Sequence, residues 1–332
     1  MTDATDTERM ARALELGASV RASTPPNPWV GCVIEAADGT VLEGATQPVG
    51  GPHAEAVALA AGADVRGGTA WVTLEPCAHH GRTPPCADAL VAAGVERVVV
   101  ALEDPDPQVA GQGIRRLREA GVTVDVGVKA GEAAALLAPY LVQRRTGRPF
   151  VVLKLAASLD GRTAAPDGSS QWITGAEARA DAHRLRAESD VVLVGAGTVR
   201  TDDPSLTVRH APAPRGDPVR VVLGGATDGA RVHPCLERDG ALGDVLDELG
   251  SAGHLQVLVE GGATVAHAFH AARMVDRYVL YLAPALFGGD DALALFRGPG
   301  AASIDDVWRG QIRSVTRLGG DLRIDLDPQE AG

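Results

Sequence analysis

The chain has 332 residues, of which 45% are apolar, enough for two globular domains with separate cores. Its formal net charge of −12 argues against a general nucleic-acid binder, because such proteins neutralise phosphates with basic groups. The N-terminus lacks the apolar core of a signal peptide, and no apolar run is long enough to cross a bilayer. We therefore expect a cytoplasmic protein without nucleic-acid or membrane partners.

The first half of the chain alternates between predicted helices and strands. Helical spacing and helix-start signals predict helices at 7–21, 54–61, 86–93, 114–120 and 132–144. Apolar runs predict strands at 29–35, 69–74, 95–101 and 122–126, with 40–43 completing a hairpin after Asp38-Gly39. This alternation is typical of a layered α/β domain.

A second unit begins around Thr146-Gly147-Arg148-Pro149, where the pattern is interrupted, so we predict domains at 1–146 and 147–332. Its predicted strands are 150–155, 190–194, 219–223, 255–259, 275–282 and 312–326, the last broken at Gly319-Gly320. Helices are predicted at 176–188 and from Glu260 through 271, and a glycine-bearing turn at 195–198. The region between 224 and 253 is poorly patterned.

The stretch from 52 to 86 carries residues suited to a catalytic zinc ion. His53, Cys77 and Cys86 supply three ligands, and three protein ligands with an open fourth position are typical of catalytic rather than structural zinc sites. His53 and Glu55 fall at a predicted helix start, whose irregular first turn could bring both to one metal. Zinc deaminases use such a ligand set with a non-ligand glutamate that moves protons. We therefore expect one zinc ion per chain, with Glu55 as general acid and base.

Two other interpretations of this stretch stay open. His79 or His80 could close a structural site as the fourth ligand, or the residues could bind no metal at all. The joint occurrence of H-x-E at a helix start, P-C and a second helix-start cysteine favours the catalytic site. The remaining cysteines, Cys32 and Cys235, are interpreted as reduced, inert thiols.

One spacing departs from the common deaminase pattern, because eight residues rather than two separate the cysteines. The segment Cys77-Ala-His-His-Gly-Arg-Thr-Pro-Pro-Cys86, with Asn27-Pro-Trp-Val-Gly31 and His53-Ala-Glu55, resembles the deaminase half of the RibD family of bifunctional riboflavin-biosynthesis enzymes. The resemblance implies a cytidine-deaminase-like three-layer domain and a phosphoribosylated diaminopyrimidinone substrate. It also implies substrate contacts by Asn27, His79, Arg82 and Thr83. A turn cap for Asn27 and solvent exposure for Arg82 are the alternatives.

Motifs in the second half resemble the reductase half of that family, in the same order. They are 154–162 (KLAASLDGR), 170–174 (SQWIT), Leu185-Arg186, 198–209 (TVRTDDPSLTVR) and Val259-Glu-Gly-Gly262. The resemblance implies a dihydrofolate-reductase-like α/β fold that uses NADPH. Cofactor contacts would then come from Ala156, Trp172, Thr198, Asp202, Gly262, Ala263, Thr264, Val265, Ala266, His267 and Ala268. Substrate contacts would come from Lys154, Ser170, Arg186, Leu206, Arg209 and Glu260.

Physical arguments leave alternatives for several of these residues. The segment from Glu260 opens a helix whose free N–H groups could bind phosphate, or it forms only a tight turn. Arg186 and Arg209 offer forked donors to a phosphate. Trp172 could instead be a core residue and Asp202 a cap. The segment 224–253 is shorter than is common in the family, which leaves the adenosine-side contacts unassigned.

We therefore predict a two-domain enzyme that deaminates a small phosphorylated pyrimidine and reduces its ribosyl side chain to ribityl with NADPH. The alternatives are a deaminase of another nucleotide, a zinc-stabilised binding protein, and a deaminase whose reductase half is impaired. The family associates through its reductase halves, which implies a homo-oligomer. The apolar strand 278–282 and the loop to Phe287 could supply that surface or be buried within one subunit.

Overall fold

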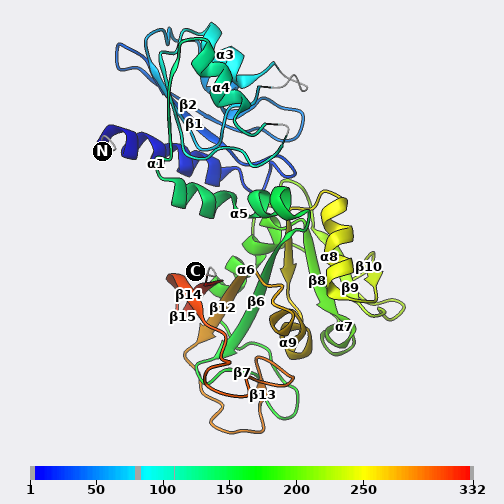
Figure 1. The fold of residues 1–332 in the computed structure, drawn as a ribbon. Coiled ribbons are helices and arrows are strands. Elements are labelled where there is room, and N and C mark those ends of the chain that lie inside the picture. Colours follow the sequence, from blue (N-terminus) through cyan, green and yellow to red (C-terminus); the bar gives the residue numbers. More distant parts are fainter. Residues whose placement is uncertain (1–3, 79–83, 108, 330–332) are drawn as a thin grey trace. The chain divides into compact units, whose positions relative to one another are not determined.

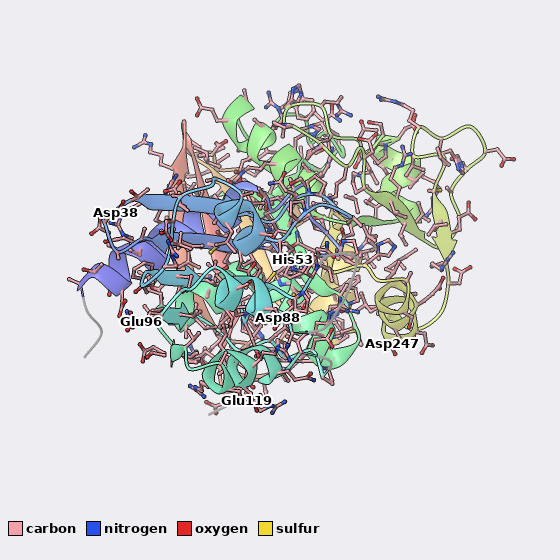
Figure 2. All side chains as sticks on the ribbon, turned by 90° about the horizontal axis from the view of Figure 1, so that it is seen from above. Asp38, His53, Asp88, Glu96, Glu119 and Asp247 are labelled. Carbon is pink, nitrogen blue, oxygen red and sulfur yellow. The ribbon has the colours of Figure 1, made fainter. Side chains whose placement is uncertain are left out.

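The computed structural model describes residues 4–78, 84–107 and 109–329. The chain forms two compact units, Met1–Gly147 and Arg148–Gly332 (Figure 1). Within the described ranges, no helix is both long enough and apolar enough to cross a membrane. Acidic side chains such as Asp38, Glu96 and Glu119 are exposed on the first unit (Figure 2), as the negative net charge leads one to expect.

In its described part, the first unit contains a five-stranded sheet with the order β2-β1-β3-β4-β5 (Figure 1). Its strands are β1 (Gly31–Glu35), β2 (Val41–Ala45), β3 (Thr69–Val72), β4 (Arg97–Val100) and β5 (Thr123–Val126). β1 is antiparallel to both β2 and β3, whereas β3, β4 and β5 are parallel to one another. The carboxyl ends of β3 and β4 therefore lie at the same edge of the sheet, where an α/β protein places its ligands.

Helices cover both faces of this sheet. α1 (Ala4–Ser19) contacts α5 (Ala130–Thr146) on one side (Figure 1). On the other side α2 (Ala54–Leu59), α3 (Cys86–Ala92) and α4 (Gln112–Glu119) contact one another in series. The three-layer α/β architecture expected from the sequence is thus confirmed.

Part of the core of the first unit lies between α1 and the sheet. Met10 of α1 packs with Val33, Trp71 and Val99 from three neighbouring strands, and all four are buried. The indole Nε1 of Trp71 donates to Asp6 Oδ1 at 2.9 Å, so the buried aromatic ring has its polar atom satisfied.

The start of α2 rests directly on β2. A Cβ atom at Gly44 would lie 2.1 Å from the carbonyl oxygen of Ala54, so glycine alone permits this approach. His53 is the N-cap residue of α2 and has an extended backbone, with φ −74° and ψ 167°. The contact between Gly44 and α2 therefore fixes where His53 and Glu55 lie relative to the sheet.

The second unit contains, among its described residues, an eight-stranded sheet with the order β10-β9-β8-β11-β6-β12-β15-β14. Its strands are β6 (Phe150–Ser158), β8 (Val191–Gly195), β9 (Val219–Leu223), β10 (Leu236–Arg238), β11 (Gln256–Val259), β12 (Arg277–Ala283), β14 (Gly310–Leu318) and β15 (Asp321–Pro328). The run from β10 to β12 is parallel, and β15 and β14 add antiparallel strands at one edge. β7 (Arg162–Ala164) and β13 (Leu293–Ala294) form a separate small sheet.

Four helices of the described chain accompany this sheet: α6 (Ala176–Glu188), α7 (Ala196–Asp202), α8 (Leu242–Ser251) and α9 (Ala263–Ala271). Leu246 of α8 and Phe269 of α9 are almost fully buried against the strands. The mixed α/β fold expected for this half is confirmed.

The predicted and observed elements differ in several places, and the strands β7, β10 and β13 are among the elements that the sequence did not predict. The sequence did not predict α8, although Leu242, Val245, Leu246 and Leu249 follow a helical period. The turn predicted at 195–198 is instead the start of α7. The strand 278–282 lies inside the sheet, between β6 and β15, whereas Leu286 and Phe287 in the following loop are exposed.

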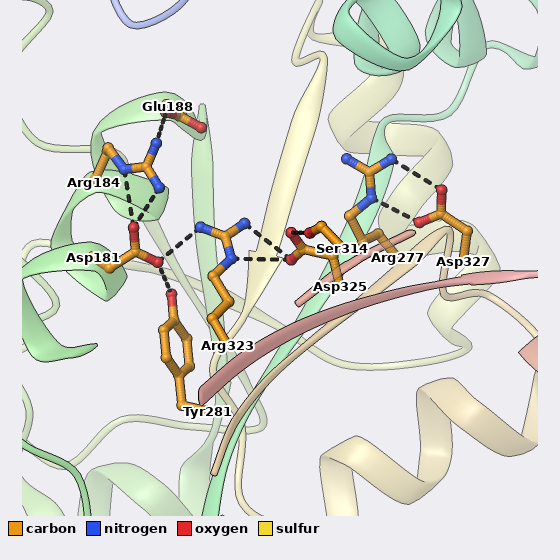
Figure 3. Close-up of polar contacts among 9 residues, drawn as sticks. All are labelled: Asp181, Arg184, Glu188, Arg277, Tyr281, Ser314, Arg323, Asp325 and Asp327. Carbon is orange, nitrogen blue, oxygen red and sulfur yellow. Dashed lines mark hydrogen bonds and ion pairs between the residues drawn. The ribbon is translucent and has the colours of Figure 1, made fainter. Parts of the chain in front are cut away.

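Charged side chains link α6 to the antiparallel edge of the second sheet (Figure 3). Asp181 of α6 accepts hydrogen bonds from Tyr281 at 2.6 Å and from Arg323 at 2.7 Å. Arg184 also pairs with Asp181, and Arg323 pairs with Asp325 at 3.0 Å. Because Asp181 and Tyr281 are buried, every partner in this network compensates for lost hydration.

Candidate active sites

Three metal-ligand side chains converge at the edge of the first sheet. His53 Nδ1 lies 3.6 Å from Cys77 Sγ and 3.3 Å from Cys86 Sγ, and the three ligand atoms all lie within 4.8 Å of one another. His53 caps α2 and Cys86 begins α3, while Cys77 follows β3. Tetrahedral zinc with nitrogen and sulfur ligands requires separations of about 3.5 Å between them. The donor set supplied by these three described residues therefore fits zinc.

The two thiols differ in how readily they lose a proton. Cys86 and His53 both hydrogen-bond to Cys77 Sγ, and these bonds hold the pKa of Cys77 well below its usual range. The backbone N–H of Cys86 also donates to Cys77 Sγ at 3.4 Å. The same Cys77–Cys86 hydrogen bond, together with burial, raises the pKa of Cys86. One thiolate is thus available for metal capture before the ion arrives, because the thiolate is the form that binds metal.

Glu55 lies in the first turn of α2 and is almost fully buried. Burial raises the pKa of its carboxyl to about 7, and the nearby Cys77 contributes in the same direction. His53, labelled in Figure 2, opposes this shift through its positive form. A carboxyl group poised near neutrality beside a metal ligand set is suited to accepting and returning protons.

A pocket of about 220 Å³ opens in front of these residues. Asn27, His53, Glu55 and Cys77 all line it, so four of the residues predicted for this site share one cavity. The predicted residues His79, Arg82 and Thr83 lie outside the described residues. His80, considered as a fourth metal ligand, lies outside them as well.

Sequence reasoning missed one wall of this pocket, which comes from the loop after β4. Asp104 and Asp106 line the cavity there, and Tyr140 donates to Asp104 Oδ2 at 3.1 Å. Arg144 of α5 lies at the same wall, with its Nε 3.4 Å from Asp106 Oδ2. The signal that could have revealed this wall is the pairing of β3 and β4. Because the two strands are parallel, the loops that follow them lie at the same edge of the sheet.

Glu75 anchors this loop from inside. Its carboxylate accepts backbone N–H bonds from Asp104, Gly111, Gly113 and Ile114, at 2.8–3.2 Å. Glu75 is buried and stands two residues before Cys77. The same strand end therefore places a metal ligand and holds the opposite pocket wall.

In the second unit, three of the residues predicted to contact substrate meet at the end of β11. Arg186 forms a two-pronged ion pair with Glu260, with its Nη2 2.9 Å from Oε2, and Lys154 Nζ lies 3.6 Å from the same oxygen. Arg186 Nη1 donates to the Thr207 carbonyl at 3.1 Å. Burial alone would raise the pKa of Glu260, but the positive charges of Arg186 and Lys154 lower this pKa to about 2. The guanidinium group of Arg186 therefore already has partners within the protein.

Arg209 lies close to this cluster with a different set of partners. Its Nη1 donates to the hydroxyls of Ser205 at 2.5 Å and Thr207 at 2.8 Å, and its side chain is exposed. The imidazole of His183 accepts the backbone N–H of Arg209 at 3.2 Å. Burial, followed by Arg186, lowers the pKa of His183 to about 4. Of the two arginines predicted to hold a phosphate, Arg209 has the more accessible charge.

Of the residues predicted to contact the cofactor, Thr198 lies in the first turn of α7, and 262–268 form the N-cap and first turns of α9. Gly262 is the N-cap of α9, and its N–H donates to Thr198 Oγ1 of α7 at 3.1 Å. A Cβ at Gly261 would lie 2.6 Å from Val265 Cβ, so the chain turns tightly into the helix. The N-terminus of α9 offers free N–H groups, as a phosphate-binding helix start requires. The residues present therefore fit a dinucleotide phosphate.

The environments of the other predicted residues bear on the alternatives left open for them. Trp172 is 70% exposed, with Arg179 Cζ 4.6 Å from its ring centre, so the alternative of a core indole is wrong. Asp202 ends α7 rather than standing before a helix, which contradicts the capping alternative. Leu206 is buried at 3% exposure with φ 53°. Ser170 lies in the loop before α6, and Ala156 lies on β6.

Two family models match consecutive parts of this chain. The cytidine and deoxycytidylate deaminase zinc-binding region matches residues 3–102, and the RibD C-terminal domain matches residues 149–324. The riboflavin biosynthesis protein RibD of Escherichia coli K12 is 41% identical over 359 residues, covering 96% of this chain and 98% of that protein. The RibD protein of Mycobacterium tuberculosis H37Rv is 43% identical over 339 residues, covering 96% of each chain.

Solved structures match over the same extent. Acinetobacter baumannii RibD, form 1, superimposes with a TM-score of 0.89 at 39% identity, covering 98% of this chain and 99% of that one. A diaminohydroxyphosphoribosylaminopyrimidine deaminase/5-amino-6-(5-phosphoribosylamino)uracil reductase from Thermotoga maritima gives a TM-score of 0.86 at 32% identity, covering 97% and 98%. Both matches span the two units, so the likeness extends to both candidate sites.

Proposed function

Because the chain belongs to the RibD family of bifunctional deaminases and reductases in riboflavin biosynthesis, we propose that its two units divide these reactions between two separate sites. The domain boundary proposed from the sequence, between 146 and 147, lies one residue before the division between the two compact units, which follows Gly147. The convergence of His53, Cys77 and Cys86 beside the buried Glu55 carries the first assignment. The proposed substrate is the diaminopyrimidinone ribosyl phosphate that the name of the Thermotoga maritima relative describes.

In the first unit, His53, Cys77 and Cys86 hold one zinc ion. A zinc ion held by these residues would supply a nucleophile at neutral pH, since zinc lowers the pKa of water. Glu55 accepts a proton at its carboxylate and returns protons to the ring nitrogen and the departing amine. Asn27 orients the pyrimidine from the pocket wall, and Arg82 with His79 and Thr83 completes the binding of the phosphorylated ribose.

In the second unit, NADPH supplies the hydride that converts the ribosyl side chain to ribityl. The N–H groups of the first turn of α9, from Ala263 onward, bind a cofactor phosphate, and Ala156, Thr198 and Asp202 line the same site. Trp172 contacts the cofactor with its exposed indole. Arg209 binds the substrate phosphate, because its charge is accessible whereas that of Arg186 is neutralised by Glu260.

Lys154, Arg186 and Glu260 act together near the reacting carbon. The two cations keep Glu260 ionised, and Glu260 in turn fixes the direction of the Lys154 ammonium group. Ser170 and Leu206 contact the substrate. We assign Arg186 a positioning role, which replaces the direct phosphate contact suggested by the sequence alone.

The test supplies the diaminopyrimidinone ribosyl phosphate to the full chain, with and without NADPH. Ammonia release should occur in both cases, and NADPH absorbance should fall only after deamination. Absence of ammonia release would contradict the assignment of the first site. Ammonia release without any oxidation of NADPH would instead favour the alternative of an impaired second unit.

We further propose that the enzyme is a homo-oligomer joined through edge strand β14 of the second unit. Ile312 and Val315 of β14 are 61% and 57% exposed. Because the register shifts between Ile312 and Ser314, these two residues pair with Leu326 and Ile324 of β15, whose side chains lie on one face of the sheet. An exposed apolar edge strand favours pairing with a second copy. Light scattering should show a dimer or larger species, which Val315→Glu converts to monomer while Val307→Glu, at an exposed loop position outside β14, does not.

All four cysteines are free thiols, and the zinc site needs two of them reduced. We therefore place the enzyme in the cytoplasm. Fractionation of cells that express the chain tests this assignment, and recovery with the membrane or secreted fraction would contradict it.

A further inference from the structure

A second group of metal-ligand side chains lies in the reductase unit, away from the residues assigned to either reaction. Among the described residues, His233, Cys235 and Glu237 place one ligand atom each within 4.8 Å of one another. Cys235 Sγ lies 3.5 Å from His233 Nδ1. This separation is the one that tetrahedral zinc imposes on sulfur and nitrogen ligands, about 3.5 Å.

The local backbone explains why the three side chains converge. Glu237 lies on β10, and Cys235 stands two residues before it along the extended chain, so both point to the same face. His233 follows a turn in which its N–H donates to the Ala230 carbonyl at 3.1 Å. The end of the loop between β9 and β10, together with the start of β10, thus supplies all three groups from five consecutive positions.

Hydrogen bonds to the backbone orient His233 and Glu237, as is usual for the side chains of metal ligands. His233 Nε2 lies 3.2 Å from the Thr227 carbonyl oxygen, which makes Nε2 the protonated nitrogen and leaves the lone pair of Nδ1 facing Cys235. Glu237 Oε1 accepts the N–H of Ala226 at 3.2 Å, which orients the carboxylate. Such outer hydrogen bonds fix the tautomer and direction of ligating histidines and carboxylates.

We propose that His233, Cys235 and Glu237 form a second zinc site, with water in the fourth position, that fastens the loop between β9 and β10. One imidazole, one thiolate and one carboxylate suit zinc better than magnesium or calcium, which prefer oxygen ligands alone. The thiolate and carboxylate together balance the charge of the ion.

A reactive cysteine is a weaker explanation of the same group. A reactive thiol would not account for the hydrogen bonds that orient its two neighbours, from His233 Nε2 to the Thr227 carbonyl and from the Ala226 N–H to Glu237. The interpretation of Cys235 as an inert thiol is also incomplete, because it does not account for the orientation of His233.

The fastened loop lies against the proposed cofactor site. A Cβ at Gly224 would lie 3.2 Å from Ala196 Cβ at the start of α7, and the N–H of Arg231 donates to Asp203 Oδ1 just after α7 at 2.7 Å. Zinc at this site would therefore order the loop that borders Thr198 and Asp202. This role rests on the proposed NADPH site, whereas zinc binding itself does not.

The test is zinc binding by the full chain, measured against a competing chromophoric chelator and followed by elemental analysis. The wild-type chain should bind about two zinc ions and Cys235→Ser about one, as His233→Gln should. Asp239→Asn removes a neighbouring exposed carboxylate outside the group and should keep both ions. A wild-type chain with one ion, or a Cys235→Ser chain with two, would overturn the proposal.

Hydrogen exchange separates this site from the deaminase site. Added zinc should slow amide exchange in 224–238 of the wild-type chain at least about tenfold, and Cys235→Ser should abolish that protection. Ammonia release by Cys235→Ser should equal that of the wild type, which also shows that the variant folds. Zinc-dependent protection of 224–238 that survives in Cys235→Ser would overturn the assignment of the ligands.

Discussion

The two candidate sites differ in how far apart their residues stand in the sequence. His53, Glu55, Cys77 and Cys86 lie within 34 positions, and each stands at a helix start or strand end. The residues of the second site come from β6, α6, α7, α9 and the loops between them. The first site is thus fixed by local chain geometry, whereas the second depends on the folding of a whole unit.

The sites also differ in how their charges are compensated. In the first site, burial raises the pKa of the Glu55 carboxyl, and His53 is the cation that opposes this rise. In the second, Glu260 is equally buried, but Arg186 and Lys154 lower its pKa. One carboxyl is prepared to exchange a proton, and the other to remain an anion.

The largest expected effect is that of Glu55→Gln, which removes the proton carrier and preserves the shape of the side chain. Ammonia release should fall about a thousandfold or more. NADPH oxidation with the deaminated intermediate should stay unchanged, and so should bound zinc. Glu8→Gln, an exposed change on α1, is the matched control for both assays. Loss of both activities in Glu55→Gln would contradict the independence of the two sites.

Arg186→Met tests whether the second site depends on its ion pair. It leaves Glu260 buried with only Lys154, which should destabilise the second unit by about 3 kcal/mol in denaturant unfolding. Arg184→Met, on the same helix with a side chain 56% exposed, should cost less than about 1 kcal/mol. Equal losses for the two variants would refute a special role for the pair at Glu260.

The same pair predicts a pH dependence. The folded-state pKa of Glu260 is about 2, below its ordinary value of 4.5, so its stabilisation is complete above about pH 4.5 and is lost as pH falls through about 2. The difference in unfolding free energy between wild type and Arg186→Met should therefore shrink from about 3 kcal/mol at pH 6 to about 1 kcal/mol at pH 3. A constant difference across this range would exclude Glu260 as the titrating group.

The smallest expected effect is that of Tyr281→Phe. It deletes the hydroxyl that donates to Asp181 at 2.6 Å and should lower stability by about 1.5 kcal/mol, without changing ammonia release. Tyr140→Phe deletes the corresponding hydroxyl in the first unit, whose bond to Asp104 is longer at 3.1 Å. That variant should raise the KM for deamination, because Tyr140 lines the pocket. If Tyr140→Phe left this KM unchanged, Tyr140 would be only structural.

Local signals allowed the convergence of the candidate zinc ligands, the hairpin at Asp38-Gly39 and most strands to be predicted from the sequence. These features depend on residues close together, such as the helix start that carries His53. The pairing of Arg186 with Glu260 joins residues 74 positions apart, and no local pattern reveals it. The resemblance to a family named both residues as substrate contacts, and the forked donors of Arg186 suggested a phosphate, but neither signal shows that the two side chains pair with each other.

Other misses have equally physical reasons. α8 was overlooked because its apolar residues are interrupted by glycine and acidic residues, although its buried face keeps the helical period. The pocket wall at Asp104, Asp106 and Arg144 became visible only once β3 and β4 were known to be parallel neighbours. The fold class and the bifunctional activity expected from the motifs are confirmed by the family.

Because Glu75 anchors the loop after β4 at both of its ends, the middle of that loop could be replaced without disturbing the rest of the site. Its two ends are tied to one carboxylate through the backbone N–H groups of Asp104, Gly111 and Gly113, so the residues between them can vary without moving the tie points. Asp106 and Val109, which face the pocket, belong to this variable part. Replacing 105–110 would therefore retune which pyrimidine is accepted while the metal ligands keep their places, which offers a route to deaminases with new substrates.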